Sequence, residues 1–568
     1  MLRVGIMCRG ESFHAWEAGI IRDLISYKDI SIELLILDEM SPKNFVSLLR
    51  KISRKYLFWQ IFYRLSSRKM TCDKIVDMKD ELKDVDKFSC QPILKGRFSQ
   101  YFSNEDLDHI RNYDLDVILR FGFNIIRGKI LESAKYGVWS YHHDDNTRYR
   151  GMPASFWEIY NTDPLTGAIL QQLTDVLDAG RIIERGYFST LSHSYAKNRN
   201  QVLNASAAWV PRACRRIIDC PSSSLFASIP ITNGNSDDEI LKEKTQLAPI
   251  YGLPTNSQMV RFIFQQFWNI FTRRVHNAIY KPCWSIGIVR RNLEDPFQIN
   301  QLDKVTWIPS PKNSFFADPF VIESDGNNYI FFEEYLYSQF SGRISMIETN
   351  DFKSFSNSEV VLEQEFHLSY PNVFEHDGRY FCIPEQAESG KMVLYEAHAF
   401  PRGWKETATI IKFPGLDPTV IRENGKWWLF AGRDGGDNSE LFLWHATDLI
   451  GPWHPHPQNP VKTDVRSSRP GGRPFLRDGK WIRPAQDCST SYGSKIVFNE
   501  ILTMSDTCYE ERSVHSLNPN PKGELPDGLH TLDSTSGFFI IDGLVMKKSW
   551  RYAFLYLMNR FSRIANLK

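Results

Sequence analysis

"ADPFVIESDGNNYIFFEE", residues 317–334, has the pattern of a buried strand, a tight turn and a second strand rich in aromatic residues. The Asp-Gly turn between two apolar runs is a strong local signal of a β-hairpin. The pattern returns at "SYPNVFEHDGRYFCIPEQ" (369–386) and "LDPTVIRENGKWWLFAGR" (416–433). A looser copy, "GRPFLRDGKWIRPAQ", starts at residue 472, and a degenerate one, "LDSTSGFFIIDG", starts at residue 532. Tandem copies of one hairpin indicate a repeat architecture.

The spacing of the copies indicates which architecture this is. Their turn glycines, Gly326, Gly378, Gly425 and Gly479, lie about 50 residues apart, which suits one four-stranded blade per repeat. Four clear copies and a weak fifth predict a five-bladed β-propeller over residues 284–545. A β-sandwich of hairpins is the alternative, and the regular spacing disfavours it.

Charged residues recur where each innermost strand of the propeller begins. In a propeller these positions converge on the central channel. We predict a ligand pocket there, formed by Asp318, Glu385, Asp417, Arg469, Arg473 and Asp533. A single Asp-Pro pair could simply start a strand, because proline fixes the turn and aspartate caps it. Carboxylates and arginines in register favour a pocket, and arginine forks suit an anionic ligand such as a sugar phosphate. We expect binding without turnover.

Strands and helices alternate before about residue 285. "LRVGIM" (2–7), "ISIELLILD" (30–38) and "DVILRFG" (116–122) are predicted strands, and "FHAWEAGIIRDLISY" (13–27) is a predicted helix. This alternation predicts a Rossmann-like α/β domain with a mostly parallel sheet covered by helices on both faces. Ligands of such sheets bind at the carboxyl ends of the strands, where "WSYHHDDNTRYRG" (139–151) begins.

The chain is too long for one hydrophobic core. Its 568 residues are predicted to form four segments. These are an α/β domain (1–205), a linker and packing helix (206–283), the propeller (284–545) and a basic amphipathic tail (546–568).

Composition excludes several functional classes. A formal net charge of +1 favours neither nucleic acid nor a polyanion as partner. The nine cysteines form no Cys-x-x-Cys pair, which disfavours a disulfide framework or a cysteine zinc site and favours the reducing cytoplasm.

We predict no signal peptide and no transmembrane segment. Two basic amphipathic stretches, 50–69 and the C-terminal one, leave peripheral membrane contact open, although surface helices packed on a core are favoured.

"SYHHDDNTRYRGMP" (140–153) and "TGAILQQLTDVLDAGRII" (166–183) resemble the core of the folate-dependent formyltransferases. That family includes methionyl-tRNA formyltransferase and the sugar N-formyltransferases, and the resemblance covers roughly residues 1–200. It implies formyl transfer from 10-formyltetrahydrofolate, as co-substrate, to an amine of a sugar or sugar nucleotide. The implied catalytic residues are Ser140, His142 and Asp178, and the implied cofactor-binding residues are Phe121, Gly122, Arg150, Gly151 and Gly180. No metal is expected.

Each implied catalytic residue has a role in that chemistry. His142 would stabilise the oxyanion and move the proton, because its ordinary pKa lies near neutrality. Asp178 would hold His142 or a water molecule. Ser140 replaces the asparagine of the family, which donates a hydrogen bond to the formyl oxygen, and a serine hydroxyl is also a donor.

"FADPF", "SYPNVFEHDG" and "SSRPGGRPFLRDGKWIRPAQDCSTSYG" resemble the propeller domain of glucosamine inositolphosphorylceramide transferase and its bacterial relatives. They are more distantly similar to five-bladed glycoside hydrolases, in which Asp318, Asp417 and Glu385 would be the positional candidates for the working carboxyls. Two functions follow. In the first, the first half transfers formyl groups and the propeller binds a glycan or nucleotide sugar. In the second, the first half is catalytically altered and the propeller itself processes glycans, as a glycosidase or glycosyltransferase. An interaction scaffold is a third, less favoured possibility.

Overall fold

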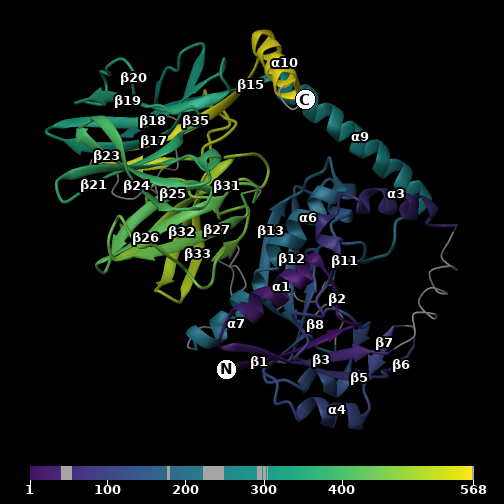
Figure 1. Ribbon diagram of the computed structural model, residues 1–568. Helices are drawn as coiled ribbons and strands as arrows, with labels where there is room; N and C mark the ends of the chain where they lie inside the picture. Colours follow the sequence, from purple (N-terminus) through teal and green to yellow (C-terminus); the bar gives the residue numbers. More distant parts are fainter. Residues whose placement is uncertain are drawn as a thin grey trace. The chain divides into compact units, whose positions relative to one another are not determined.

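The computed structural model divides the chain into two compact units, Met1–Asn269 and Ile270–Lys568 (Figure 1). Each unit is described by itself. The finer domain limits at residues 205, 283 and 545 stay predictions. The described residues are 1–39, 54–96, 98–175, 180–221, 248–290, 297, 302, 305–436, 438–535 and 537–565.

A seven-stranded sheet forms the centre of the first unit, in the order β13-β12-β10-β8-β1-β3-β5 (Figure 1). Its parallel strands are β1 (Leu2–Cys8), β3 (Ile30–Asp38), β5 (Asp86–Cys90), β8 (Val117–Arg120) and β10 (Val138–His142). Two antiparallel strands, β12 (Leu165–Gln172) and β13 (Arg181–Ser189), complete one edge. The sheet is therefore mostly parallel.

Hydrophobic clusters cover both faces of this sheet. Val4 and Ile6 of β1 belong to one cluster together with Leu24 of helix α1, and Met7 and Ile118 belong to the other. Burial on both faces explains why these strands are nearly continuous apolar runs. The helices of this unit are α1 (Ala15–Ser26), α3 (Leu57–Ser67), α4 (Asn104–Arg111), α5 (Trp157–Asn161), α6 (Tyr195–Ser206), α7 (Trp209–Asp219) and α9 (Asn256–Ile279), the last of which continues into the second unit.

Short elements connect these larger ones. The short helices are η1 (Thr71–Asp73) and η2 (Gly128–Glu132). The short strands are β2 (Ser12–His14), β4 (Ile75–Asp77), β6 (Ile93–Lys95), β7 (Ser99–Tyr101), β9 (Ile125–Ile126), β11 (Arg150–Gly151) and β14 (Ile250–Tyr251).

The described residues of the second unit form five antiparallel sheets, in addition to its helical segments. The first is β17 (Ser314–Ser324), β18 (Asn327–Leu336), β19 (Ser341–Thr349) and β20 (Glu359–Leu362). The second is β21 (Ser369–His376), β22 (Arg379–Glu385), β23 (Met392–Ala399) and β24 (Arg402–Ile411). The third is β25 (Gly415–Glu423), β26 (Lys426–Arg433), β27 (Glu440–Ala446) and β28 (His454–Pro455), with β29 (Lys462–Thr463) beside β27. The fourth is β30 (Phe475–Arg477), β31 (Lys480–Asp487), β32 (Lys495–Met504) and β33 (Tyr509–Leu517).

The fifth sheet closes the ring, because it takes strands from both ends of the unit. It contains β15 (Tyr280–Arg290), β16 (Thr306–Ile308), β34 (Leu532–Ser534) and β35 (Phe538–Lys548), and helix α10 (Trp550–Ala565) follows. The early strand β15 pairs with the late strand β35 along its full length. The inner strand β17 packs against both β21 and β34, and Gly472 bridges Leu532. Five sheets closed in this way form a five-bladed β-propeller (Figure 1).

The turn in each repeat explains the recurring Asp-Gly or Asn-Gly pair. Asp325 has φ 52° and Gly326 has φ 80°, and the corresponding pairs of the next three copies are also left-handed. Two consecutive positive φ angles define the hairpin turn that matches the twist of the strands, and glycine adopts such a conformation without a steric penalty.

Candidate functional site

Three inner strands of the propeller each contain, within their first five residues, one residue in the left-handed backbone region. These residues are Asp318 (φ 52°), Tyr370 (φ 44°) and Asp417 (φ 51°). Each lies at a shift in the pairing register between the inner strand and its neighbour. Left-handed backbone is uncommon for residues other than glycine, and register shifts of this kind re-aim a side chain. We call these strand starts the ring positions.

Arg469 holds Asp417 through a two-pronged contact. Its Nε donates to Asp417 Oδ2 at 2.6 Å and its Nη2 donates to Oδ1 at 3.0 Å. Gln486 donates to the same Oδ2 at 2.6 Å. Burial raises the pKa of Asp417 to about 6, against the lowering effect of Arg469, and the charges of Asp318 and Glu385 raise it further. This carboxyl therefore titrates close to neutrality.

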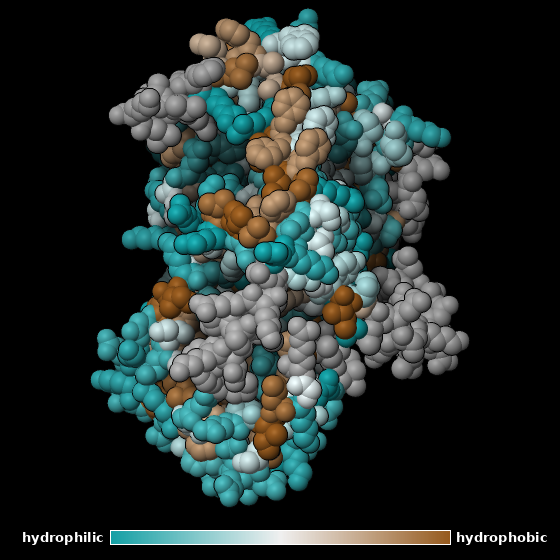
Figure 2. All heavy atoms as spheres, turned by 90° about the vertical axis from the view of Figure 1, so that its right-hand side faces the viewer, coloured by the Kyte–Doolittle hydropathy of each residue, from teal (hydrophilic) through white to brown (hydrophobic). Residues whose placement is uncertain are grey.

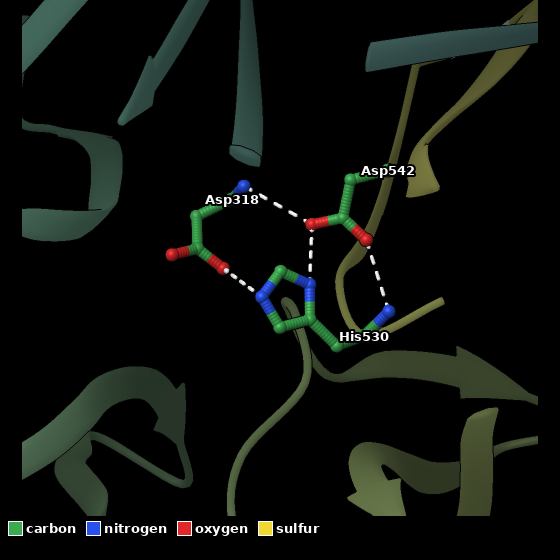
Figure 3. Close-up of side chains that lie close together, drawn as sticks. All are labelled: Asp318, His530 and Asp542. Carbon is green, nitrogen blue, oxygen red and sulfur yellow. Dashed lines mark hydrogen bonds and ion pairs between the residues drawn. The ribbon is translucent and has the colours of Figure 1, made fainter. Parts of the chain in front are cut away.

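His530 lies between two carboxylates, as Figure 3 shows. Its Nδ1 is 2.5 Å from Asp542 Oδ2, and its Nε2 is 3.5 Å from Asp318 Oδ1. Asp542 also accepts the backbone N–H groups of Asp318 at 3.1 Å and of His530 at 2.9 Å. Burial lowers the pKa of His530, but Asp542 and Asp318 outweigh it and the pKa is raised. The two aspartates therefore favour the protonated form of the imidazole.

These three residues also have the side chains of a metal site. Their ligand atoms lie within 4.8 Å of one another, and all three side chains are buried. The sequence had predicted no metal. In this arrangement the proton of His530 already supplies the positive charge that the two aspartates require. A divalent cation would have to displace that proton.

Glu333 and Glu385 occupy equivalent positions in two neighbouring blades. Glu333 pairs with the residue directly before Asp318, and Glu385 pairs with the residue directly before Tyr370. His367 Nε2 lies 3.6 Å from Glu333 Oε1 and 3.7 Å from Glu385 Oε2, so it bridges the two carboxyls. Burial, followed by the charges of Asp318 and Glu385, raises the pKa of Glu333 well above its usual range. Glu333 was missed in the sequence, although aligning "FFEE" with "IPEQ" would have shown it.

Backbone and hydroxyl donors fix Glu385. The Ser369 hydroxyl donates to Oε2 at 2.7 Å and the Ala387 N–H donates to Oε1 at 2.8 Å. Its two oxygens are thus held in one orientation, which is the preorganisation that a reacting carboxylate needs.

The structure does not bring Arg473 and Asp533 together with the carboxyls described above. Arg473 donates to Asp533 Oδ2 at 3.1 Å, and the same oxygen accepts the N–H of Val321 at 2.9 Å. Asn372 makes the equivalent link to the N–H of Val420 at 3.2 Å in another pair of blades. Asp533 therefore ties neighbouring inner strands together. The degenerate fifth copy hid this register, because it lacks the Asp-Pro pair.

Thr531 takes the fifth ring position instead. Its hydroxyl donates to Asp318 Oδ1 at 2.7 Å. Tyr370 is fully buried, and its hydroxyl shares a hydrogen bond of 2.9 Å with Thr419 and accepts the Gly472 N–H at 2.7 Å. The structure thus gathers four of the predicted residues and three others into one group whose charges act on one another, which we call the ring cluster. The predicted members are Asp318, Glu385, Asp417 and Arg469, and the others are Glu333, His530 and Asp542.

The first unit places several predicted residues at one edge of its sheet. Phe121 and Gly122 follow β8, and their N–H groups donate to Met7 O at 3.0 and 2.9 Å. Ser140 and His142 lie on the neighbouring parallel strand β10, with His142 at its carboxyl end. The ring Nε2 of His142 donates to the Tyr149 carbonyl at 3.1 Å, which fixes the ring.

The hydroxyl of Ser140 is already committed within the fold. It accepts a hydrogen bond of 2.7 Å from Arg120 Nη1 and donates to the Tyr141 carbonyl at 3.4 Å. Formyl transfer requires a donor that is free to reach the developing oxyanion. In this arrangement Ser140 does not fit that role.

The remaining predicted residues of the first unit have structural surroundings. Arg150 and Gly151 form β11, which pairs with β14. Gly151 has φ 100°, and a Cβ there would lie 2.1 Å from the Tyr251 carbonyl oxygen, so only glycine fits. Gly180 directly precedes β13. Asp178 lies outside the described residues.

Sequence reasoning also missed a buried carboxyl pair in the first unit. Burial raises the pKa of Asp144 to about 6, although the carboxyl accepts the Ser155 N–H at 2.8 Å. Burial and the neighbouring Asp144 raise the pKa of Glu158 well above its usual range. Two carboxyls this close and this buried do not both ionise at neutral pH.

Comparison with known proteins relates the propeller to one family. Residues 297–525 match the family model "Glucosamine inositolphosphorylceramide transferase 1, N-terminal". The match lies wholly within the second unit. It gives no support to the formyltransferase resemblance of the first unit.

Two curated relatives carry the same name. The protein of Arabidopsis thaliana is 34% identical over 220 residues, which cover 37% of this chain and 29% of the relative. The protein of Oryza sativa subsp. japonica is 33% identical over 210 residues, which cover 36% of this chain and 28% of the relative. The chain thus spans less than a third of the length of these relatives.

Solved structures of glycoside hydrolases show a much weaker likeness. A family 117 glycoside hydrolase of Zobellia galactanivorans is 16% identical, with 41% of this chain and 85% of that chain covered and a TM-score of 0.30. CoXyl43, a β-xylosidase/α-arabinofuranosidase from a compost metagenome, is 13% identical, with 41% and 91% covered and a TM-score of 0.31. Similarity at this level says nothing about chemistry.

Proposed function

We propose that the propeller unit is a glycan-processing enzyme that transfers or hydrolyses a glycosyl group at the ring cluster. The observation that carries this proposal is the pairing of Glu333, a carboxyl with a raised pKa, with the oriented carboxyl of Glu385 across His367. The match to the family model named for glucosamine inositolphosphorylceramide transferase 1 supports it. This replaces the expectation of binding without turnover.

Glycosyl chemistry needs one group that gives a proton and another that takes one. Burial and the acidic neighbours of Glu333 raise its pKa and so favour its protonated form, which suits it to the role of proton donor to the departing oxygen. Glu385, held by Ser369 and Ala387, is the carboxylate that activates the incoming hydroxyl. A carboxyl with a raised pKa is the usual proton donor in such chemistry.

The charge balance of the ring cluster favours a neutral or amino sugar. Five carboxyl groups, those of Asp318, Glu333, Glu385, Asp417 and Asp542, act on one another there. The only cations among the described residues of the cluster are Arg469 and His530, and aspartates hold both. The arginines were predicted to favour an anionic ligand. In the structure Arg469 donates hydrogen bonds to Asp417 and Asn438, and Arg473 donates one to Asp533. A protonated amine suits this cluster better than a phosphate does.

The test is a turnover assay on the full chain with amino-sugar glycosides, neutral glycosides and nucleotide sugars, with products identified by mass spectrometry. Glu333→Gln and Glu385→Gln should each lower turnover by at least about a hundredfold, the usual worth of a positioned acid or base. Glu406→Gln, an exposed change in the same unit, is the matched control and should leave turnover unchanged. Sugar binding without turnover would overturn the enzyme proposal, as would turnover that survives in both glutamine variants.

For the first unit, formyl transfer from 10-formyltetrahydrofolate to an amine of a sugar is a second candidate. The neighbouring ends of β8 and β10, which bring Phe121 and His142 to one edge, favour it. The committed hydroxyl of Ser140 opposes it. Calorimetry with 5-formyltetrahydrofolate tests it, and the folate should bind more tightly to Ser140→Asn, which restores the family residue. Absence of binding to both folded proteins would end this candidate.

A further inference from the structure

Helix α9 exposes an aromatic stripe. Met259 and Phe262 are fully buried, so one face of the helix is anchored in the first unit. The exposed fractions are 56% for Val260, 71% for Phe264, 69% for Phe267 and 57% for Trp268. These residues recur at helical spacing and share one face. Figure 2 shows a band of hydrophobic side chains along this helix. The sequence predicted a packing helix within 206–283, and the structure leaves this face open to solvent.

Helix α3 extends the apolar surface of the first unit. It packs beside α9, because the Phe58 N–H donates to Asn256 Oδ1 at 3.0 Å and the rings of Phe62 and Phe262 lie 5.5 Å apart. Its own exposed apolar residues are Leu57, Phe58, Ile61 and Leu65. We call these four residues and Val260, Phe264, Phe267 and Trp268 of α9 the aromatic face.

The two helices of the aromatic face carry only basic charged side chains. Neither 54–69 nor 256–279 contains an aspartate or a glutamate. The exposed basic residues of the first unit in these stretches are Arg54, Lys55, Arg64, Arg68, Lys69 and Arg261. The stretch 50–69, for which membrane contact had been left open, is described from residue 54. It packs Trp59 into the core, as the favoured surface-helix interpretation expects, and exposes the opposite side.

We propose that the aromatic face docks on an anionic lipid surface. Aromatic and aliphatic side chains at this exposure enter the boundary between headgroups and acyl chains, and arginine and lysine meet the anionic headgroups. Among the described residues, no helix has the length and apolar character needed to cross a bilayer, so the contact lies in the plane of the interface. The charge pattern disfavours a second copy of the chain as the occupant. Symmetric pairing would place two basic faces together with no acidic residue between them.

The test is co-sedimentation of the full chain with vesicles of equimolar phosphatidylcholine and phosphatidylserine, and with vesicles of phosphatidylcholine alone. Binding is expected to the anionic vesicles and to weaken as salt is added. Phe264→Ser combined with Phe267→Ser should weaken it by about a hundredfold, roughly tenfold for each ring removed from the interface. Arg64→Glu combined with Arg68→Glu should abolish the preference for phosphatidylserine.

Leu476→Ser combined with Leu502→Ser is the matched control, because both leucines are exposed on propeller strands, at 58% and 44%. This variant should bind like the wild type. The substituted side chains are exposed, so all variants should melt at the wild-type temperature. No binding to anionic vesicles, or equal losses in the phenylalanine and leucine variants, would overturn the proposal. A dimer in light scattering that the phenylalanine variant dissociates, without vesicle binding, would overturn it in favour of self-association.

Discussion

Replacing Arg469 by leucine should destabilise the propeller strongly, because it leaves a buried carboxylate without its cation. Asp417 is 1% exposed and receives two donors from Arg469. Removing one partner of a buried ion pair costs about 3–5 kcal/mol. The loss should depend on pH. Without Arg469 the pKa of Asp417 rises above its present value of about 6, and each unit is worth about 1.4 kcal/mol. The carboxyl is protonated at pH 5 in either protein, so the loss there should be smaller than at pH 8.

Differential scanning calorimetry of the full chain measures this effect. For a unit of this size a loss of about 3–5 kcal/mol lowers Tm by roughly 6–10 °C. Adding Asp417→Asn to Arg469→Leu should recover most of the loss, since the buried charge is then gone. Arg402→Leu is the matched control, because Arg402 makes an equally two-pronged contact with Glu359 at 2.7 Å but on the exposed surface. Exposed pairs contribute less than about 1 kcal/mol. The reasoning is refuted if Arg469→Leu costs no more than Arg402→Leu, or if the added asparagine makes the loss worse.

Three further predictions concern titration and register. The pKa values of His530 and Asp417 are raised in the folded protein, so both groups stabilise the propeller at low pH. That stability is lost as pH rises, and for Asp417 the loss runs from about pH 4 to about pH 6. The propeller Tm should therefore fall over that range. An opposite slope in calorimetry would contradict this. Glu158→Gln should lessen the loss of stability of the first unit as pH rises, because burial and the charge of Asp144 raise the pKa of Glu158 in the folded protein, and an unchanged slope would exclude this origin. Asp533→Ala should cost about 1–3 kcal/mol through the unpaired inner-strand N–H, whereas Asp533→Asn should be mild, as chemical denaturation would show.

The propeller could be predicted because its signals are local. Asp-Gly turns and Asp-Pro strand starts repeat along the chain, and the backbone angles at Asp318 and Asp417 follow from them. The fifth ring position could not be located, because Thr531 carries neither signal. The raised pKa of Glu333 could not be predicted, because it comes from burial and from carboxyls that only the closed ring brings together.

The other differences arise from contacts between distant segments. The hydroxyl of Ser140 is committed to Arg120, which lies on the neighbouring strand, and no local pattern indicates that pair. Helix α9 carries apolar residues on two faces, so its sequence does not say which face packs. The structure buries Met259 and Phe262 and exposes Phe264 and Phe267.

The most direct test of the central claim is a crystal structure of the chain with a bound amino-sugar glycoside. The account predicts sugar density within about 3 Å of the carboxyl oxygens of Glu333 and Glu385, with the glycosidic oxygen facing Glu333. It also predicts that crystals of Glu385→Gln hold the intact glycoside at the same place, because the amide can hydrogen-bond the sugar but cannot activate the incoming hydroxyl. Sugar bound elsewhere on the propeller, with the ring cluster unchanged and out of its reach, would contradict the account.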